Sequence, residues 1–393
     1  MDMSFMWMVE FLLTSESSLS DCVGNDNRDI VMYRISSVLF VFMAALTSCC
    51  HNGKTITVTN KTDIDRSMET VEVSLARLGD IPKAEFVVID DTGAQIPSQI
   101  IDDSLLLFQV NVKANSSRTY ECRPGKRMLT DTLAYSRYVP ERLDDYAYEN
   151  NLVAGRIYGK SLSDPRTFGP DIWVKSTDKL VIDKWFAQAD YHHDHGEGLD
   201  CYKVGNTLGG GACAPVVGDK VIAGNNWATH RTICNGAIRT AAEFCTEPFI
   251  VNDMTVNAKR TLTLDANTRM TKWTVTFFAE TDSLDVVLGA VLHDVVSRED
   301  GDNYISFTEK ASDSQTPDLD GNISIGLVLE KGISSISDTV DGHAVLRFKA
   351  KCGEPVTYWT ASGWSKGGVE SADYWNHYMR EQAMIVNSPL TIN

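Results

Sequence analysis

Basic residues are scarce in this sequence. There are 36 Lys and Arg against 53 Asp and Glu, which gives a formal net charge of −17. Binding to nucleic-acid phosphates needs clustered Lys and Arg, so this composition argues against a nucleic-acid partner. The sequence also lacks a GxGxxG motif, a Walker loop and an alternating strand–helix rhythm. These absences argue against a nucleotide-binding α/β fold.

Cysteine pairs with the spacing of metal or redox motifs are also missing, because none of the nine Cys forms a CxxC pair. A chain of this length does not need disulfides to supply a core. An exported chain permits disulfides, but their pairing does not follow from sequence spacing. We expect most of these Cys to be buried thiols.

An apolar stretch long enough to span a membrane is not found at the N-terminus either. Arg34 precedes an apolar core over residues 35–46, which has the length of a signal peptide. The tetrapeptide LTSC that ends at Cys49 resembles a bacterial lipobox. These features predict a lipoprotein signal peptide over residues 32–48, lipidation of Cys49 and anchoring in the bacterial cell envelope, on the periplasmic or outer-membrane face. Residues 1–31 are then expected to be an over-extended gene model.

What the sequence does contain, from Lys54 onward, is a series of short β-branched and aromatic runs separated by polar turns. Several alternate apolar and polar residues, as over residues 271–277, which is typical of half-buried antiparallel strands. The runs occupy residues 55–59, 72–76, 85–89, 105–112, 118–122, 272–279, 284–292, 323–329, 344–350 and 355–361. We therefore expect a mainly β protein in which residues 49–393 form a single large β-sandwich domain.

One helix is expected near the C-terminus. Ser371 is a suitable N-cap, and Trp375, Tyr378, Met379 and Gln382 follow at helical spacing. The apolar spacing indicates a helix that packs over the sheet rather than one that binds a partner.

The segment over residues 137–240 is unusually rich in polar residues and glycine. Three of the eight His in the chain fall within four positions, at His192, His193 and His195. Each buried polar group without a partner costs about 1–3 kcal/mol. We therefore expect this segment to line a cleft or to hold a ligand.

Three interpretations of the histidine segment stay open. In an extended backbone, alternate side chains point to opposite faces. One face would carry Tyr191, His193 and His195, and the other would carry Asp190, His192 and Asp194. The first set suits general acid–base chemistry, whereas the second set, or His193 with His195 and Glu197, suits a divalent cation. The third interpretation is a solvated loop with a structural hydrogen-bond network.

The first polar block favours a sugar-acid site. Arg142 or Arg156 can hold a uronate carboxylate as a planar fork, and either can instead pair with the neighbouring acids. Trp173 and Trp227 can form the floor of a sugar subsite, or they can pack in the core.

Three strings of this region resemble a known family. They are PERLDDYAYENNLVAGRIYG, GPDIWVK and YHHDHGEGLDCYKVGNTLGGG, and they look like the domain-of-unknown-function family numbered 4861, found in polysaccharide-degrading bacteria. The resemblance implies a galactose-mutarotase-like antiparallel β-supersandwich with a carbohydrate ligand in a concave groove. The matching positions are Glu141, Arg142, Asp145, Glu149, Asn150, Arg156, Tyr158, Tyr191, His192, Asp194, Gly196, Glu197, Gly198, Asp200, Tyr202, Gly205 and Gly209.

The sequence therefore predicts an enzyme that acts on uronic-acid-containing, pectin-type oligosaccharides by acid–base chemistry at a sugar carbon, as an epimerase, mutarotase or lyase. His192 or His193 would be the base, and Tyr191 or Glu197 the complementary acid. The substrate-binding candidates are Glu141, Arg142, Asp145, Glu149, Asn150, Arg156, Tyr158, Asp194, Asp200, Trp173 and Trp227.

Two other functions stay open. A glycoside hydrolase would use a pair of carboxylates such as Glu149 and Glu197, and a non-catalytic lipoprotein would bind glycans in the same groove. The acid–base chemistry requires no cofactor, and a divalent cation remains an alternative.

Overall fold

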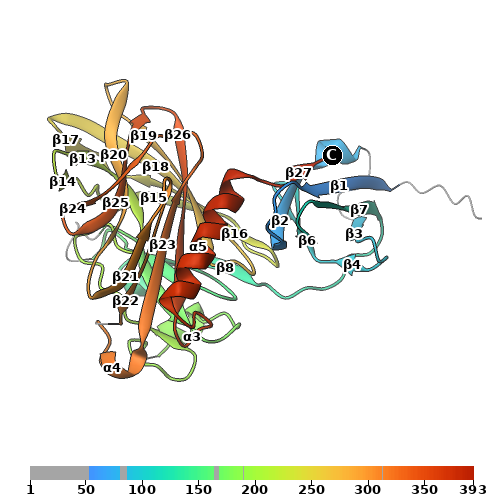
Figure 1. The fold of residues 1–393 in the computed structure, drawn as a ribbon, viewed down its shortest axis with the longest axis horizontal. Coiled ribbons are helices and arrows are strands. Elements are labelled where there is room, and N and C mark those ends of the chain that lie inside the picture. The colour runs from blue at the N-terminus through green and yellow to red at the C-terminus, as the bar shows by residue number, and fades with distance from the viewer. Residues whose placement is uncertain (1–52, 80–85, 163–167, 189, 312) are drawn as a thin grey trace, which may run out of the picture. The chain divides into compact units, whose positions relative to one another are not determined.

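Antiparallel strands make up most of the structure, which is a computed structural model (Figure 1). It describes residues 53–79, 86–162, 168–188, 190–311 and 313–393. The expected gene-model segment, the signal peptide and the lipidation site at Cys49 lie outside the described residues, and the predicted domain limits stay a prediction. No helix within the described chain is both long and apolar enough to cross a membrane.

Two sheets are built from the first part of the described chain together with its last strand. One has the order β27 (Thr391–Ile392), β1 (Lys54–Asn60), β7 (Ser116–Pro124), β3 (Phe86–Ile89) and β4 (Gln95–Ile96). The other has the order β2 (Arg66–Ser74), β6 (Leu105–Val112) and β5 (Ser98–Ile101). Their buried side chains, among them Val58, Val71 and Phe108, form one hydrophobic core.

The largest sheet contains most of the later strands. Its order is β15 (Trp227–Cys234), β16 (Arg239–Thr246), β18 (Met254–Asp265), β19 (Met270–Phe278), β26 (Pro355–Trp364), β23 (Asn322–Leu329), β22 (Tyr304–Lys310) and β21 (Val295–Asp300). A further strand, β17 (Phe249–Val251), pairs with β18.

Two five-stranded sheets contribute to the same core as the largest sheet. The first has the order β14 (Lys220–Val221), β13 (Ala212–Val217), β20 (Ser283–Val291), β25 (His343–Lys351) and β24 (Ile336–Val340). The second has the order β12 (Gly198–Asp200), β11 (Asp171–Lys175), β10 (Ala154–Ile157), β9 (Asp145–Asn150) and β8 (Ala134–Val139). Tyr146, Leu288 and Trp273, one from each sheet, belong to a single buried cluster, as the layers of a sandwich require.

The expected mainly β, antiparallel fold is confirmed. Over β19, Trp273, Val275 and Phe277 are buried while the residues between them are partly exposed, so the predicted alternation holds. The strand expected over residues 72–76 is wrong at its end. There β2 stops at Ser74 and the 3-10 turn η3 (Leu75–Leu78) follows, because Leu75 and Leu78 both turn into the core.

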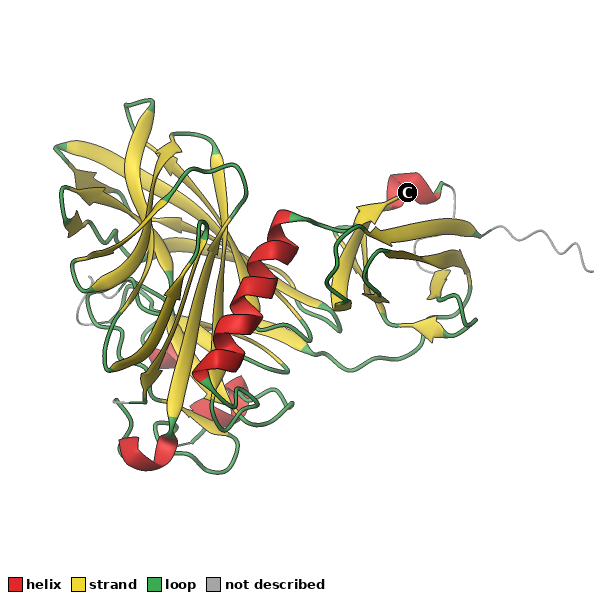
Figure 2. Cartoon of the chain, in the orientation of Figure 1, coloured by secondary structure: helices red, strands yellow, loops and turns green. Residues whose placement is uncertain are grey.

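The C-terminal helix is also confirmed. Helix α5 (Ala372–Asn387) begins after Ser371, whose Oγ accepts a hydrogen bond from the backbone N–H of Tyr374. The helix lies along strands of the largest sheet (Figure 2). Trp375 and Met379 are fully buried against these strands, and the Trp375 indole donates to the carbonyl of Ile325. Packing of this kind is the covering role that the spacing indicated. The other described helical turns are η4 (Pro140–Arg142), α3 (Ile182–Phe186) and α4 (Pro317–Asp320).

Candidate functional site

The sheet of β8 to β12 brings four charged side chains together. Arg156 on β10 lies directly opposite Asp171 on β11 in the strand register. Asp145 on β9 and Asp200 on β12 are their diagonal neighbours, offset by two residues along the strands. Side chains two residues apart share a face of the sheet, so the register itself surrounds one Arg with three Asp.

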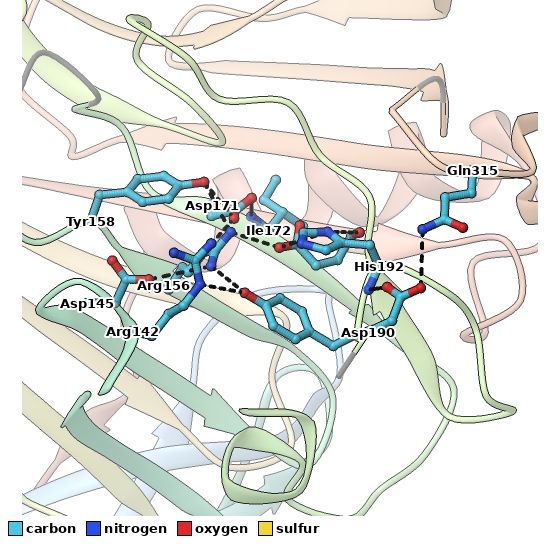
Figure 3. A network of polar contacts seen from close by, with 11 residues as sticks. Arg142, Asp145, Arg156, Tyr158, Asp171, Ile172, Asp190, His192 and Gln315 are labelled. Atoms are coloured by element: carbon cyan, nitrogen blue, oxygen red, sulfur yellow. Dashed lines mark hydrogen bonds and ion pairs between the residues drawn. The ribbon is translucent and has the colours of Figure 1, made fainter. Parts of the chain in front are cut away.

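Arg156 is buried, and its guanidinium contacts all three carboxylates (Figure 3). Its Nε donates to Asp171 at 2.8 Å and its Nη2 to Asp200 at 2.9 Å, while its Nη1 lies 3.4 Å from Asp145. The phenol of Tyr158 also donates to Asp171, at 2.8 Å. The guanidinium therefore occupies the centre of the network.

Three buried carboxylates around one cation leave an excess of negative charge. Burial raises the pKa of Asp145 to about 6, although the charge of Arg156 opposes the shift. Burial also raises the pKa of Asp171. The pKa of Asp200 is raised well above its ordinary value, first by burial and then by the negative charge of Asp171. Like charges this close cannot all ionise, so the cluster retains protons at a pH where ordinary carboxyls have lost them.

The hydroxyl of Tyr191 joins this cluster to the polar turn at Arg142. Its oxygen accepts from Arg156 Nη1 at 2.9 Å and from Arg142 Nε at 3.1 Å. The ring packs beside Trp173 and Phe186, with centroids 5.5 and 5.7 Å apart. The phenol is thus held in place by two guanidinium groups and by aromatic contacts.

His192 lies next to Tyr191, with the two ring centroids 4.6 Å apart. Its Nδ1 is 3.1 Å from the carbonyl oxygen of Asp200 and 3.5 Å from the carboxylate. The side chain is 47% exposed, whereas that of Asp200 is 3% exposed. His192 therefore gives this buried network an imidazole that solvent can reach.

The histidine segment is not extended, so the expected division into two faces is wrong. It runs as a series of bends before β12, and Tyr191 and His192 approach the same network. The Asp194 carboxylate caps the bend by accepting from the N–H groups of Gly196 and Gly198. Neighbours in sequence point the same way because such bends break the period of two.

The other two His lie outside the network. His193 and His195 are exposed and contact each other, with ring centroids 5.5 Å apart. Glu197 pairs with Lys184 at 2.5 Å. The structure therefore places one His of the segment, His192, in the network.

Two predicted sugar contacts are fully buried within the fold. Glu149 accepts from the N–H groups of Val181 and Ile182 and pairs with Lys175 at 3.1 Å, and both side chains of this pair are 0% exposed. Asn150 donates to the carbonyls of residues 265 and 268. These contacts engage both groups in holding strands and turns, and leave them no surface toward a ligand.

The remaining candidates lie in three different settings. Trp173 is fully buried in a cluster of aromatic and aliphatic side chains. Glu141 is exposed and pairs with Arg137 at 2.7 Å. Trp227 and Tyr158 line a small cavity inside the sandwich.

A histidine–glutamate pair near the segment escaped the sequence reasoning. The Nδ1 of His293 lies 2.8 Å from Oε1 of Glu309, which is almost fully buried. The charge of Asp313 acts on the pKa of both His293 and Asp200. No local motif marks this pair, because sixteen residues separate its members.

Within the described chain, no group of three or more His, Cys, Asp or Glu is arranged to hold a metal ion. The three Asp of the network face a guanidinium rather than one another. The six described cysteines are free, and of these Cys122, Cys201 and Cys213 are buried.

The comparisons with known proteins agree with this picture of the fold. The family model described as "Domain of unknown function (DUF4861)" matches residues 58–392. The chain belongs to the DUF4861 family. This confirms the resemblance in the polar strings. The more specific galactose-mutarotase-like assignment stays a prediction.

One curated protein and two solved structures are similar to this DUF4861 chain. "Uncharacterized protein P7" of Formosa agariphila is 29% identical, over 92% of this chain and 100% of its own length. An alpha-mannosidase from Enterococcus faecalis is 9% identical with a TM-score of 0.52, and a glycosyl hydrolase family 38 protein from the same species is 8% identical with a TM-score of 0.51. These two matches cover 87% and 88% of this chain but only 46% and 48% of the matched chains. The likeness shows the fold alone.

Proposed function

We propose that this protein is a carbohydrate-active enzyme that performs acid–base chemistry at a carbon of a uronic-acid-containing, pectin-type oligosaccharide, as an epimerase, mutarotase or lyase. The observation that carries the proposal is the hydroxyl of Tyr191, which two guanidinium groups hold beside a half-exposed imidazole. The fold shared with an alpha-mannosidase supports a sugar as the ligand class.

Arg142 is the group that would hold the uronate carboxylate. Arg156 is excluded from that role because its guanidinium is already bonded to buried carboxylates. Arg142 is partly exposed, and its hydrogen bond within the described chain uses Nε and leaves both terminal nitrogens for a ligand. A planar guanidinium edge of this kind fits a carboxylate.

Proton transfer would then proceed between the sugar and the pair formed by His192 and Tyr191. The base takes the proton from the carbon beside the carboxylate, and the electron pair spreads into the carboxylate, whose charge Arg142 offsets. In a lyase the adjacent C–O bond breaks, and the leaving oxygen takes a proton from the acid. In an epimerase the acid instead returns a proton to the same carbon from its other face.

His192 is the proposed base and Tyr191 the proposed acid. The carboxyl of Asp200 lies 3.5 Å from Nδ1 of His192 and so supports the imidazole. His193 and Glu197 are the weaker choices, because His193 stands outside the network and Glu197 is engaged by Lys184. A hydrolase that pairs Glu149 with Glu197 is disfavoured by the complete burial of Glu149.

The test is solvent-proton exchange. The full chain is incubated in D2O with oligogalacturonides and other uronate oligosaccharides, and NMR follows deuterium entering the sugar. Ultraviolet absorbance follows unsaturated uronate, and a reducing-end assay follows hydrolysis. Deuterium incorporation or formation of unsaturated uronate that is lost in His192→Ala and kept in the exposed-neighbour control His193→Ala supports the proposal.

Two results would contradict it. New reducing ends with neither deuterium at the sugar carbon nor unsaturated uronate would indicate a hydrolase. Saturable binding with neither exchange nor product across the uronate set would indicate a non-catalytic glycan-binding protein.

We also propose that the protein is held in the bacterial cell envelope by a lipid on Cys49. The tetrapeptide that ends at this residue supports the assignment. Metabolic labelling with an alkyne fatty acid should mark the wild-type chain and leave Cys49→Ser unlabelled. A labelled Cys49→Ser protein would refute the assignment.

A further inference from the structure

A small cavity lies inside the sandwich, away from the acid–base pair. It has a volume of about 20 Å³ and is lined in part by the aromatic side chains of Phe168, Trp227, Phe244 and Tyr358. A volume of this size holds one water, or one ion of similar size, with room for little more.

Arg260 on β18 projects into this cavity from the inner face of the largest sheet. Its carbon Cζ lies 4.1 Å from the ring centroid of Phe168, and its Nη2 contacts the carbonyl of Cys213 at 3.4 Å. Its Nε is buried and has no hydrogen-bond partner. Among the described residues, no carboxylate forms an ion pair with Arg260.

The groups around Arg260 do not neutralise it. Burial raises the pKa of the Cys213 thiol and of the Tyr358 phenol, so both neighbours stay neutral at physiological pH. Burial also lowers the pKa of Arg260 itself, which reflects the cost of an unpaired charge there. A guanidinium stays protonated in a protein, so the described residues that line the cavity carry a net positive charge.

Two further polar atoms that line the cavity are unpartnered. The indole Nε1 of Trp227 and the side-chain oxygen of Asn226 are buried without a hydrogen bond, although the two side chains are 5% and 8% exposed. The amide of Asn226 cannot be flipped to change this, because its nitrogen donates to the carbonyl of Gly159 at 2.8 Å. Buried polar atoms without a partner are rare and indicate a bound water or ion.

We propose that this cavity is a binding site for one small monovalent anion of halide size, held by Arg260 and Trp227. Both supply N–H donors, and the guanidinium supplies the compensating charge. The side-chain oxygen of Asn226 is an acceptor and takes no part in holding the anion. A water alone would satisfy the hydrogen bonds but would leave the charge of Arg260 unpaired.

The direct test is a crystal of the full chain grown or soaked in sodium bromide. Anomalous scattering at the bromine edge distinguishes bromide from water. We expect an anomalous peak in the cavity, within contact distance of Arg260 Nε. Density in the cavity without anomalous signal under saturating bromide would identify a water and overturn the proposal.

The solution test separates specific binding from salt effects. We expect the wild-type midpoint of thermal unfolding to rise saturably, by about 2–4 °C, when chloride replaces gluconate at constant ionic strength. Arg260→Met removes the unpaired charge with a similar side-chain length, so the variant is expected to fold and to lose the chloride response. The control Lys259→Met lies on the opposite face of β18, where Lys259 pairs with Glu243, and should keep it.

Either of two outcomes would overturn the proposed anion site. An equal chloride response in wild type and in Arg260→Met would mean that the effect arises elsewhere. A bromide peak with no saturable response in solution would mean an adventitious ion only. Neither outcome bears on the uronate chemistry. That chemistry is measured on the sugar and is assigned to His192 and Tyr191, which do not line this cavity.

Discussion

The phenol oxygen of Tyr191 lies 2.9 Å from Nη1 of Arg156, a residue 35 positions earlier in the chain. This contact ties the loop before β12 to the centre of the sheet that carries the acidic network. It also brings the tyrosine beside the half-exposed imidazole of His192. The histidine segment and the first polar block thus form one site.

Removal of the Tyr191 hydroxyl should affect catalysis more than folding. Tyr191→Phe keeps the ring contacts with Trp173 and Phe186 and removes the acceptor of two guanidinium donors, Arg156 Nη1 and Arg142 Nε. We expect turnover to fall about 100-fold or more and the free energy of unfolding to fall by about 1–3 kcal/mol. Deuterium exchange measures turnover, and urea unfolding measures the free energy of unfolding. A fully active variant would remove Tyr191 from the chemistry.

The buried carboxyl of Asp145 should make stability depend on pH. Burial raises its pKa from 3.8 to about 6 in the folded protein. The folded state therefore binds more protons than the unfolded state in this range, so this contribution to stability is present below about pH 4 and is lost as the pH rises through about 6. Asparagine cannot ionise, so the Asp145→Asn variant does not lose this stability as the pH rises. The difference in unfolding free energy between Asp145→Asn and wild type should shift in favour of the variant by about 3 kcal/mol from pH 4 to pH 7. A difference that does not change with pH would contradict the raised pKa.

The buried pair of Glu149 and Lys175 should act in the fold and not in ligand binding. Lys175→Met removes the cation and leaves the Glu149 carboxylate without its charge partner, which should cost about 3–5 kcal/mol of unfolding free energy. Glu149→Gln replaces one carboxylate oxygen by an NH2 group but keeps an oxygen that can accept from the N–H groups of Val181 and Ile182, and should cost less. Substrate affinity of the folded Glu149→Gln variant should equal that of wild type in calorimetry. Lost affinity with intact stability would restore Glu149 as a sugar contact.

Gly198 should be required at the start of β12. Its φ is +124°, and a Cβ atom there would lie 1.9 Å from the carbonyl oxygen of Val174 on β11. Gly198→Ala should therefore disturb the strand pairing that positions Asp200 and cost at least about 2 kcal/mol. Gly196→Ala is the matched control, since Gly196 also has a positive φ but nothing lies near its Cβ position. Equal effects of the two substitutions on the thermal midpoint would show that backbone strain alone matters.

Glu309 should hold the pKa of His293 above its ordinary value. Burial lowers the pKa of His293, but the hydrogen bond and the charge of Glu309 outweigh it and raise the pKa overall. The corresponding stability is present below the unfolded pKa and is lost as the pH rises through the higher folded value. Glu309→Gln should bring the pKa of His293 down in an NMR titration. An unchanged pKa would mean that Glu309 does not control this imidazole.

The strand pattern of this protein could be predicted because alternation along a strand is a local property. Burial of Trp273, Val275 and Phe277 follows directly from side chains two residues apart sharing a face. The cap at Ser371 is likewise set by neighbours in sequence. Prediction failed at Leu75, where tertiary packing and not propensity ends the strand.

The members of the site could be predicted only in part. Polar composition singled out Tyr191, His192, Arg156 and Asp200, but gave Glu149 the same weight as these. Burial separates them, because the Glu149 carboxylate is consumed by Lys175 and two backbone N–H groups. Burial depends on which strands pack together, and no single segment encodes it.

Local spacing and composition by themselves predicted the antiparallel strands and the covering helix, and they singled out the polar region in which we place the site. The family was indicated by the resemblance of three polar strings and is shown by the family match. Only the tertiary structure decided that one histidine of three meets the network, that Arg156 is bonded to aspartates while Arg142 keeps a free edge, and that no carboxylate of the described residues pairs with Arg260. The physical reason is that charge pairing and desolvation depend on distances between segments far apart in the chain. Those distances exist only after the sheets have packed.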